Sequence, residues 1–98
     1  MLHIINRSPL SDVALDSCLN TASGGDILLI EDAVYAATAG NAFEGKLRAA
    51  MGRFNISVLR PDLDARGLSD RLIEGANSVD YAGFVDLVAA NKTCQSWL

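Results

Sequence analysis

Metal-binding side chains are scarce in this chain, which has one histidine, His3, and two cysteines, Cys18 and Cys94. The cysteines form no C-x-x-C pair. With a single histidine they cannot supply the usual ligand set of a structural zinc site. A structural disulfide is not expected in a reducing compartment. We therefore predict two free thiols, no resident metal and no cofactor.

The chain also lacks a long hydrophobic run and an export signal. Its longest unbroken apolar stretch, Ile27-Leu28-Leu29-Ile30, is far too short to cross a bilayer. The first residues, MLHIINRSP, have no basic n-region and no small-residue cleavage pattern. We expect a cytoplasmic protein without membrane contact.

Positive charge and aromatic residues are sparse too. The net charge is −4, from 12 acidic and 8 basic residues, and aromatic residues make up 6% of the chain. Lys46, Arg48, Arg53 and Arg60 fall in one stretch, but Lys46 and Arg48 point to different sides of a helix, and no aromatic side chains interleave with them. Direct binding of nucleic acid is therefore not expected.

Short apolar strands alternate with helical patterns along most of the chain, and half of its residues are hydrophobic. Strands are expected at residues 2–6, 27–30 and 55–59, near Val79, and in the tail KTCQSWL, which suits an edge strand. The run ILLI is typical of a strand buried on both faces of a sheet. We predict one α/β domain over residues 1–98, a flavodoxin-like three-layer α/β/α fold with a mainly parallel sheet of about five short strands.

Helices are expected between these strands. Ser11 is a plausible N-cap for a helix carrying Leu15, Cys18 and Leu19 on one stripe, which Gly24-Gly25 would end. A second helix is expected at 42–52, and AVYAATAG predicts a short helix or turn. Two further helical segments are predicted to begin at caps, one at Ser69 carrying Leu72 and Ile73, the other at Asp80 with Tyr81, Phe84, Val85 and Val88 on a shared face.

Functional sites of open α/β sheets gather at the carboxyl ends of the strands. Those ends carry Glu31, Asp32 and Asp62, whose oxygens could bind a divalent cation. Such carboxylates more often cap helices or pair with arginine. A stand-alone domain that binds a metal or a small ligand through these three residues remains one hypothesis.

His3 and Cys18 are the remaining residues with reactive side chains. No Ser-His-Asp arrangement is apparent, and His3 is most simply a partly buried strand residue, or one at an interface. Cys18 lies well past the start of its helix, which contains Asp12 and Asp16 but no cation to lower the pKa of a thiol. These surroundings favour a core or interface residue over a reactive one, and Cys94 is expected to be structural filler or a surface residue.

A series of segments in order along nearly the whole chain resembles the TusB/DsrH family: MLH, RSP, LLIEDAVYAA, VLRPDLDARGL, VDYAGFVDL and QSWL. The resemblance implies a domain of the DsrE/DsrF/DsrH type that is the smallest of three homologous subunits. Its partners would be a DsrE/TusD-like and a DsrF/TusC-like subunit, assembled as a dimer of heterotrimers. Such complexes relay persulfide sulfur for 2-thiolation of the tRNA wobble uridine or for sulfur oxidation.

The resemblance also bears on catalysis. In the sister subunit that carries sulfur, the active cysteine lies at the end of the third strand, before an arginine-glycine segment. The matching stretch here, Leu59-Arg60-Pro61-Asp62 ahead of Arg66-Gly67, contains no cysteine. The prediction is a non-catalytic subunit of the relay. Its alternative is a sulfurtransferase that carries persulfide on Cys18, a position that members of the sulfur-oxidising branch tend to share.

Overall fold

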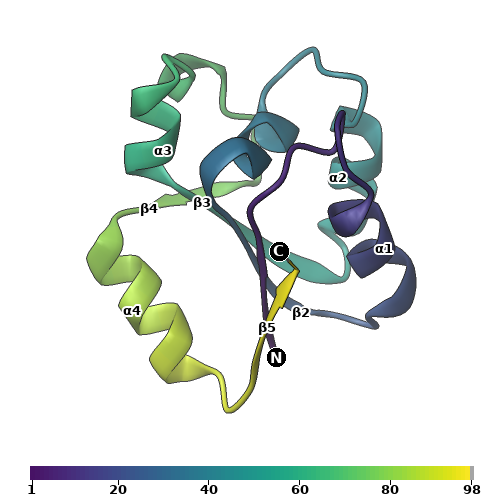
Figure 1. The fold of residues 1–98 in the computed structure, drawn as a ribbon, viewed down its shortest axis with the longest axis vertical. Helices are drawn as coiled ribbons and strands as arrows, with labels where there is room; N and C mark the ends of the chain where they lie inside the picture. Colours follow the sequence, from purple (N-terminus) through teal and green to yellow (C-terminus); the bar gives the residue numbers. More distant parts are fainter. Residues whose placement is uncertain (98) are drawn as a thin grey trace.

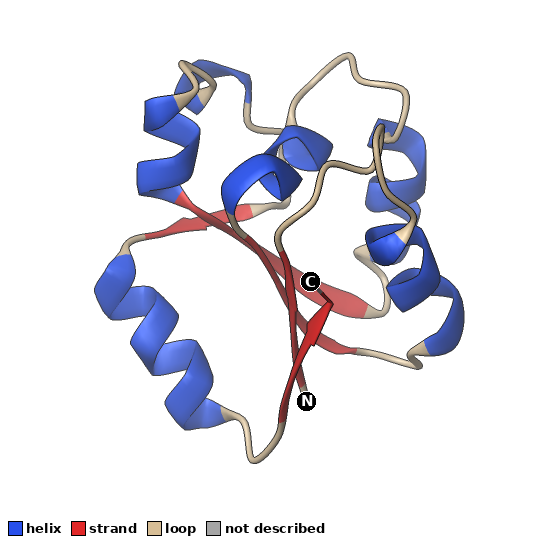
Figure 2. Ribbon diagram, in the orientation of Figure 1, coloured by secondary structure: helices blue, strands red, loops and turns tan. Residues whose placement is uncertain are grey.

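The computed structural model describes residues 1–97, which form one sheet of five short strands between two layers of helices (Figures 1 and 2). The strands are β1 (Leu2–Ile5), β2 (Gly25–Leu29), β3 (Phe54–Leu59), β4 (Asn77–Val79) and β5 (Cys94–Trp97). Their order is β4-β3-β2-β1-β5, and each neighbouring pair is parallel. The predicted α/β class and the parallel sheet are confirmed, and the tail forms an edge strand up to Trp97, while Leu98 lies outside the described residues.

One face of the sheet is covered by most of the helical segments (Figure 1). They are α1 (Ala14–Thr21), the 3₁₀ segment η1 (Glu31–Ala37), α2 (Glu44–Ala50) and α3 (Arg60–Ala65). A 3₁₀ turn, η2 (Ser69–Arg71), follows α3. The other face is covered by α4 (Tyr81–Ala90), which leads from β4 at one edge to β5 at the opposite edge. Each connection is thus a helical crossover, as parallel pairing requires.

The main core lies between the sheet and the larger helical layer. Alternate residues of the central strands point into it, among them Ile27, Leu29, Ile56 and Val58, which are buried. Leu28, pointing to the opposite face, is also fully buried. The central strand is therefore buried on both faces, as its unbroken apolar run predicted.

The α4 layer differs from the prediction. Asp80 caps this helix as expected, its Oδ1 accepting the N–H of Gly83 at 2.8 Å. Tyr81, Val85 and Val88 do share one side, but that side faces outward, and Tyr81 and Val85 are 63% and 66% exposed. Phe84, the fourth residue of the predicted face, is half-buried. None of the α4 residues is fully buried. Three of the four residues of the predicted apolar face are therefore exposed, which leaves an apolar helix surface in the isolated chain.

Several predicted ends of elements were wrong. The first helix begins at Ala14, whose N–H is accepted by Asp12 Oδ1 at 2.8 Å, so Ser11 is not its cap. It ends at Thr21. Gly25 instead opens β2 with a φ of 118°, where a Cβ would lie 2.6 Å from the Met1 carbonyl oxygen.

Around Pro61 the chain does not pass into a loop. Strand β3 ends at Leu59 as expected, but helix α3 starts at the next residue, Arg60, with Pro61 in its first turn. Proline suits that position because its fixed φ is helical and its missing N–H needs no partner there. The 3₁₀ turn at Ser69 ends at Arg71, so Leu72 and Ile73 lie beyond it rather than within it.

Candidate functional site

Polar side chains lie close together at the carboxyl ends of β1, β2 and β3, as expected for a parallel sheet. Glu31 is the only non-glycine residue of the described chain with a positive φ, 51°. Its N–H donates to Asp62 Oδ2 at 2.6 Å, and its Oε2 accepts from Asn6 Nδ2 at 3.3 Å. Three strand ends are thus joined by side chains at a backbone position that costs free energy to hold.

Asp32, the next residue, is paired with an arginine. Arg66 Nη2 and Nε lie 2.9 and 3.1 Å from Asp32 Oδ1. Arg66 Nη1 also donates to the Asp62 carbonyl oxygen at 3.1 Å. The carboxylates that the sequence suggested as cation ligands are therefore engaged, that of Asp32 with an arginine, that of Asp62 with a backbone N–H and that of Glu31 with the side-chain amide of Asn6. Within residues 1–97, no group of three or more histidine, cysteine or acidic side chains is arranged to hold a metal ion.

A cleft of about 300 Å³ opens beside this cluster, lined by Asn6, Arg7, Ser8, Ser11, Glu31 and Asp32. Asn6 Oδ1 is buried at its edge with no hydrogen-bond partner in the described chain. At the end of β3, Arg60 Nη2 donates to Ser78 Oγ at 2.8 Å. No thiol lies at this edge of the sheet within the described residues, because both cysteines are elsewhere.

Cys18 is fully buried in the main core, on the side of α1 that also carries Leu15 and Leu19. The apolar stripe of the sequence predicted this position. Burial raises the pKa of its thiol to about 11, since the charged thiolate loses solvation there. At neutral pH the side chain is a protonated thiol, which is a poor nucleophile.

Cys94 begins β5 and pairs in register with Leu2, at the amino end of the strands. It is exposed, in contrast to Cys18. The two thiols therefore differ in solvent accessibility, and neither lies at the polar edge formed by Asn6, Glu31 and Asp62.

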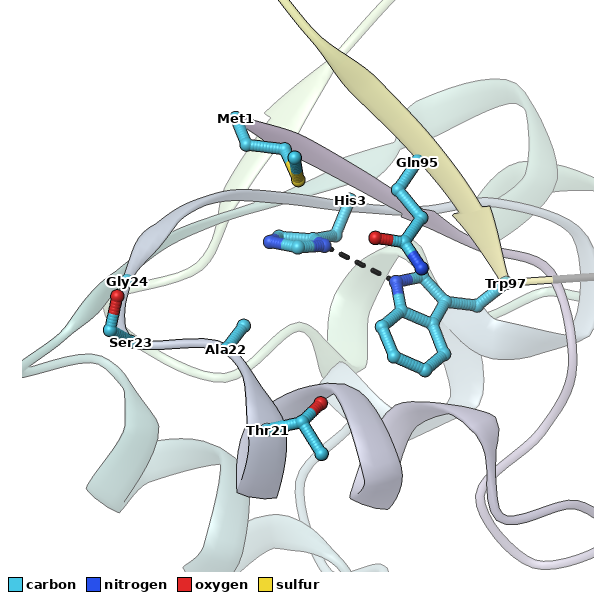
Figure 3. Close-up of a pocket in the computed structure, with 8 residues that line it drawn as sticks. All are labelled: Met1, His3, Thr21, Ala22, Ser23, Gly24, Gln95 and Trp97. Carbon is cyan, nitrogen blue, oxygen red and sulfur yellow. Dashed lines mark hydrogen bonds between the residues drawn. The ribbon is translucent and has the colours of Figure 1, made fainter.

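His3 is only 4% exposed, and it belongs to a pocket that the sequence did not reveal (Figure 3). Trp97 Nε1 donates to His3 Nδ1 at 3.2 Å. Burial, together with the positive amino group of Met1, lowers the pKa of His3 below its ordinary 6.5. Periodicity could not have paired these residues, because 94 positions separate them. The only sequence signal for this contact was that both termini were predicted to form strands.

The fold and these sites define a small α/β domain with a five-stranded parallel sheet. Two solved structures share this fold. The ychN protein of Escherichia coli superimposes with a TM-score of 0.74 at 16% identity, covering 97% of both chains. Protein MTH1491 of Methanobacterium thermoautotrophicum superimposes with a TM-score of 0.75 at 15% identity, covering 97% of this chain and 95% of its own.

Sequence comparison identifies the family. The family model described as "DsrH like protein" matches residues 7–94. Protein TusB of Escherichia coli O81 (strain ED1a) is 39% identical over 99 residues, covering 99% of this chain and all of the relative. Protein TusB of Shigella flexneri is 37% identical with the same coverage. The chain belongs to the DsrH-like family, which confirms the resemblance noted in its sequence. None of the helices among residues 1–97 is long and apolar enough to span a membrane.

Proposed function

We propose that this protein is a subunit of a sulfur-relay complex and that it does not itself carry the sulfur. The observation that carries the proposal is the carboxyl end of β3. The resemblance places the active cysteine of the sister subunit at this position. This chain has Leu59 and Arg60 there, and Arg60 donates a hydrogen bond to Ser78. A relay needs an accessible thiol of lowered pKa, and this position offers a guanidinium instead.

The environment of Cys18 supports the same proposal. A buried thiol with a pKa of about 11 is protonated at neutral pH and has no open path to a donor persulfide. The alternative, a persulfide carried on Cys18, requires α1 to move away from the core or a partner to open it.

Assembly with homologous subunits is the second part of the proposal. The exposed apolar residues Tyr81, Val85 and Val88 leave hydrophobic surface on α4 in the isolated chain. Neighbouring exposed apolar side chains on one face of a small domain are typical of an interaction site. We propose that the DsrE/TusD-like and DsrF/TusC-like partners cover this surface in a dimer of heterotrimers, and that the complex serves tRNA wobble-uridine thiolation or sulfur oxidation.

Co-expression with the two homologous subunits tests assembly. We expect one stable species that contains all three chains, with its mass measured by light scattering after size-exclusion chromatography. Recovery of this chain only as a monomer, beside folded partners, would contradict the proposal.

Mass spectrometry tests the non-catalytic role. The complex is incubated with a persulfide donor, and the mass of each chain is then measured. We expect added sulfur on a partner chain and none on this one. Added sulfur that maps to Cys18 and disappears in Cys18→Ala would replace the proposal with the sulfurtransferase alternative.

A further inference from the structure

A second pocket lies at the amino end of the sheet, opposite the polar edge that the proposed function concerns. It has a volume of about 440 Å³, which lies in the range of small-ligand sites. Its walls come from β1, from β5 and from the segment that joins α1 to β2 (Figure 3). His3 and Trp97 both line the pocket, with ring centroids 6.2 Å apart.

The hydrogen bond from Trp97 determines which nitrogen of His3 carries the proton. An indole N–H only donates, so His3 Nδ1 must accept and cannot be protonated. In the neutral imidazole the proton therefore sits on Nε2. Figure 3 shows that this nitrogen points away from Trp97, toward the side of the pocket formed by Ser23 and Gly24. No hydrogen bond within residues 1–97 engages it, so the pocket presents a donor without an acceptor.

The charges around His3 favour an anion. None of the eight residues that line the pocket is acidic. The amino group of Met1 is close enough to lower the pKa of His3, and the guanidinium of Arg53 donates to the carbonyl oxygen of Ala22, a residue of the pocket wall, at 3.3 Å. Asp26, the acidic residue paired with Leu2, accepts from Asn91 at 3.0 Å, so its carboxylate is engaged with the end of α4.

We propose that this pocket binds a carboxylate, with His3 Nε2–H as the central donor and the hydroxyl of Ser23 as a further donor at its side. Thr21 is not among them, because its hydroxyl donates to the Ser17 carbonyl oxygen at 2.7 Å. Met1, Ala22 and Trp97 provide apolar contacts for a short aliphatic group. The ligand is thus a small aliphatic carboxylate, either free or as an aspartate or glutamate side chain of another protein.

The chain contains one histidine and one tryptophan, and both line the pocket, so their signals report on this site alone. Propionate is titrated into ¹⁵N-labelled protein while the imidazole proton resonances of His3 and the indole N–H of Trp97 are followed. Propionamide, similar in shape but neutral, is the matched control ligand. We expect propionate to shift the resonances of both residues and to bind at least about tenfold more tightly than propionamide. The reason is that a hydrogen bond to a charged acceptor is stronger than one to a neutral acceptor.

Two variants complete the test. His3→Phe keeps an aromatic ring and removes the donor, and propionate affinity should fall by about tenfold or more. Cys94→Ser changes an exposed residue of β5 outside the pocket and should bind propionate like the wild type. Equal affinity for propionate and propionamide, or wild-type shifts that miss His3 and Trp97, would overturn the proposal even if His3→Phe failed to fold.

The same resonances distinguish the two sources of the carboxylate. If a partner supplies it, His3 in the assembled complex should already show the shifted resonance, and propionate should change it no further. If the ligand is free, propionate should shift His3 in the complex as it does in the isolated chain. Failure of propionate to bind the isolated chain would overturn this inference but would leave the assembly with sister subunits untouched.

Discussion

Trp97 donates a hydrogen bond to His3 across 3.2 Å, and this contact joins β5, the last strand, to β1, the first. It requires an unprotonated Nδ1, because the indole N–H can only donate. Protonation of His3 would place two donors face to face. Burial and the Met1 amino group, which lower the pKa of His3, act in the same direction as this bond.

The first prediction is a loss of stability on acidification. The pKa of His3 is lower in the folded chain than its ordinary 6.5, so the unfolded chain binds more protons at mildly acidic pH. The stability that neutral His3 contributes is complete above pH 6.5. It is lost as the pH falls from there toward the lower pKa of His3 in the folded chain. Urea unfolding from about pH 8 to about pH 5.5 should show the free energy of unfolding decreasing.

His3→Gln is the control for this experiment, because glutamine does not titrate. Its free energy of unfolding should change less over the same pH range than that of the wild type. Parallel pH profiles for the two proteins would show that other groups cause the acid sensitivity.

The second prediction concerns the two thiols. Iodoacetamide at neutral pH should alkylate Cys94, which is exposed, and should leave Cys18 unmodified until the protein is denatured. Intact-mass spectrometry should then show one alkylated cysteine in the native chain and two in the denatured chain. Cys18→Ala should lower the free energy of unfolding by about 1 kcal/mol, for the buried atom that it removes. Rapid alkylation of Cys18 in the native chain would contradict its place in the core.

The third prediction concerns the strained residue at the carboxyl edge. Asp62 accepts the N–H of Glu31, whose φ is 51°. Asp62→Ala removes this acceptor and should cost about 1–2 kcal/mol of stability. Asp70→Ala, an exposed aspartate in η2, is the matched control and should change stability by less than about 0.5 kcal/mol.

Glu31→Gly provides a second measurement at the same place. Glycine adopts a positive φ without a Cβ clash, so Asp62→Ala should cost less in the Glu31→Gly background than in the wild type. Additive effects of the two substitutions would mean that Asp62 does not hold the backbone of Glu31. Both free energies can be obtained from chemical denaturation.

The fourth prediction concerns α4 and the proposed assembly. Val85→Lys places a charge in the middle of the exposed apolar side and should weaken co-purification with the sister subunits. Because Val85 is 66% exposed, the melting temperature of the isolated chain should change little.

Asp86→Lys introduces the same side chain at the next position of the same helix and is the control for location. It should leave the yield of the complex closer to that of the wild type. An intact complex with Val85→Lys would show that the partners do not contact this side of α4.

Much of the fold was predictable because its signals are local. The run Ile27–Ile30 indicated a strand buried on both faces, and Asp80 marked the start of α4. The stripe of Leu15, Cys18 and Leu19 placed Cys18 in the core. Each of these signals depends on residues within a few positions of one another. The family resemblance was likewise carried by short segments in order, and the comparisons confirmed it.

The candidate site was only partly predictable. The sequence indicated that Glu31, Asp32 and Asp62 would meet at the ends of parallel strands. It could not indicate that Arg66 would engage Asp32 from 34 positions away. The short helix α3 was missed because Pro61 serves equally as the end of a strand and as the first turn of a helix.

The amino-acid sequence by itself determined the α/β class, the central buried strand and the absence of a cysteine after β3, since these follow from residue type and short-range periodicity. Only the tertiary structure decided the strand order, the outward orientation of the apolar side of α4, and the pairing of His3 with Trp97. Those features depend on which strands become neighbours in the sheet. Residues 94 positions apart meet only after the whole chain has folded, and no local pattern records that contact.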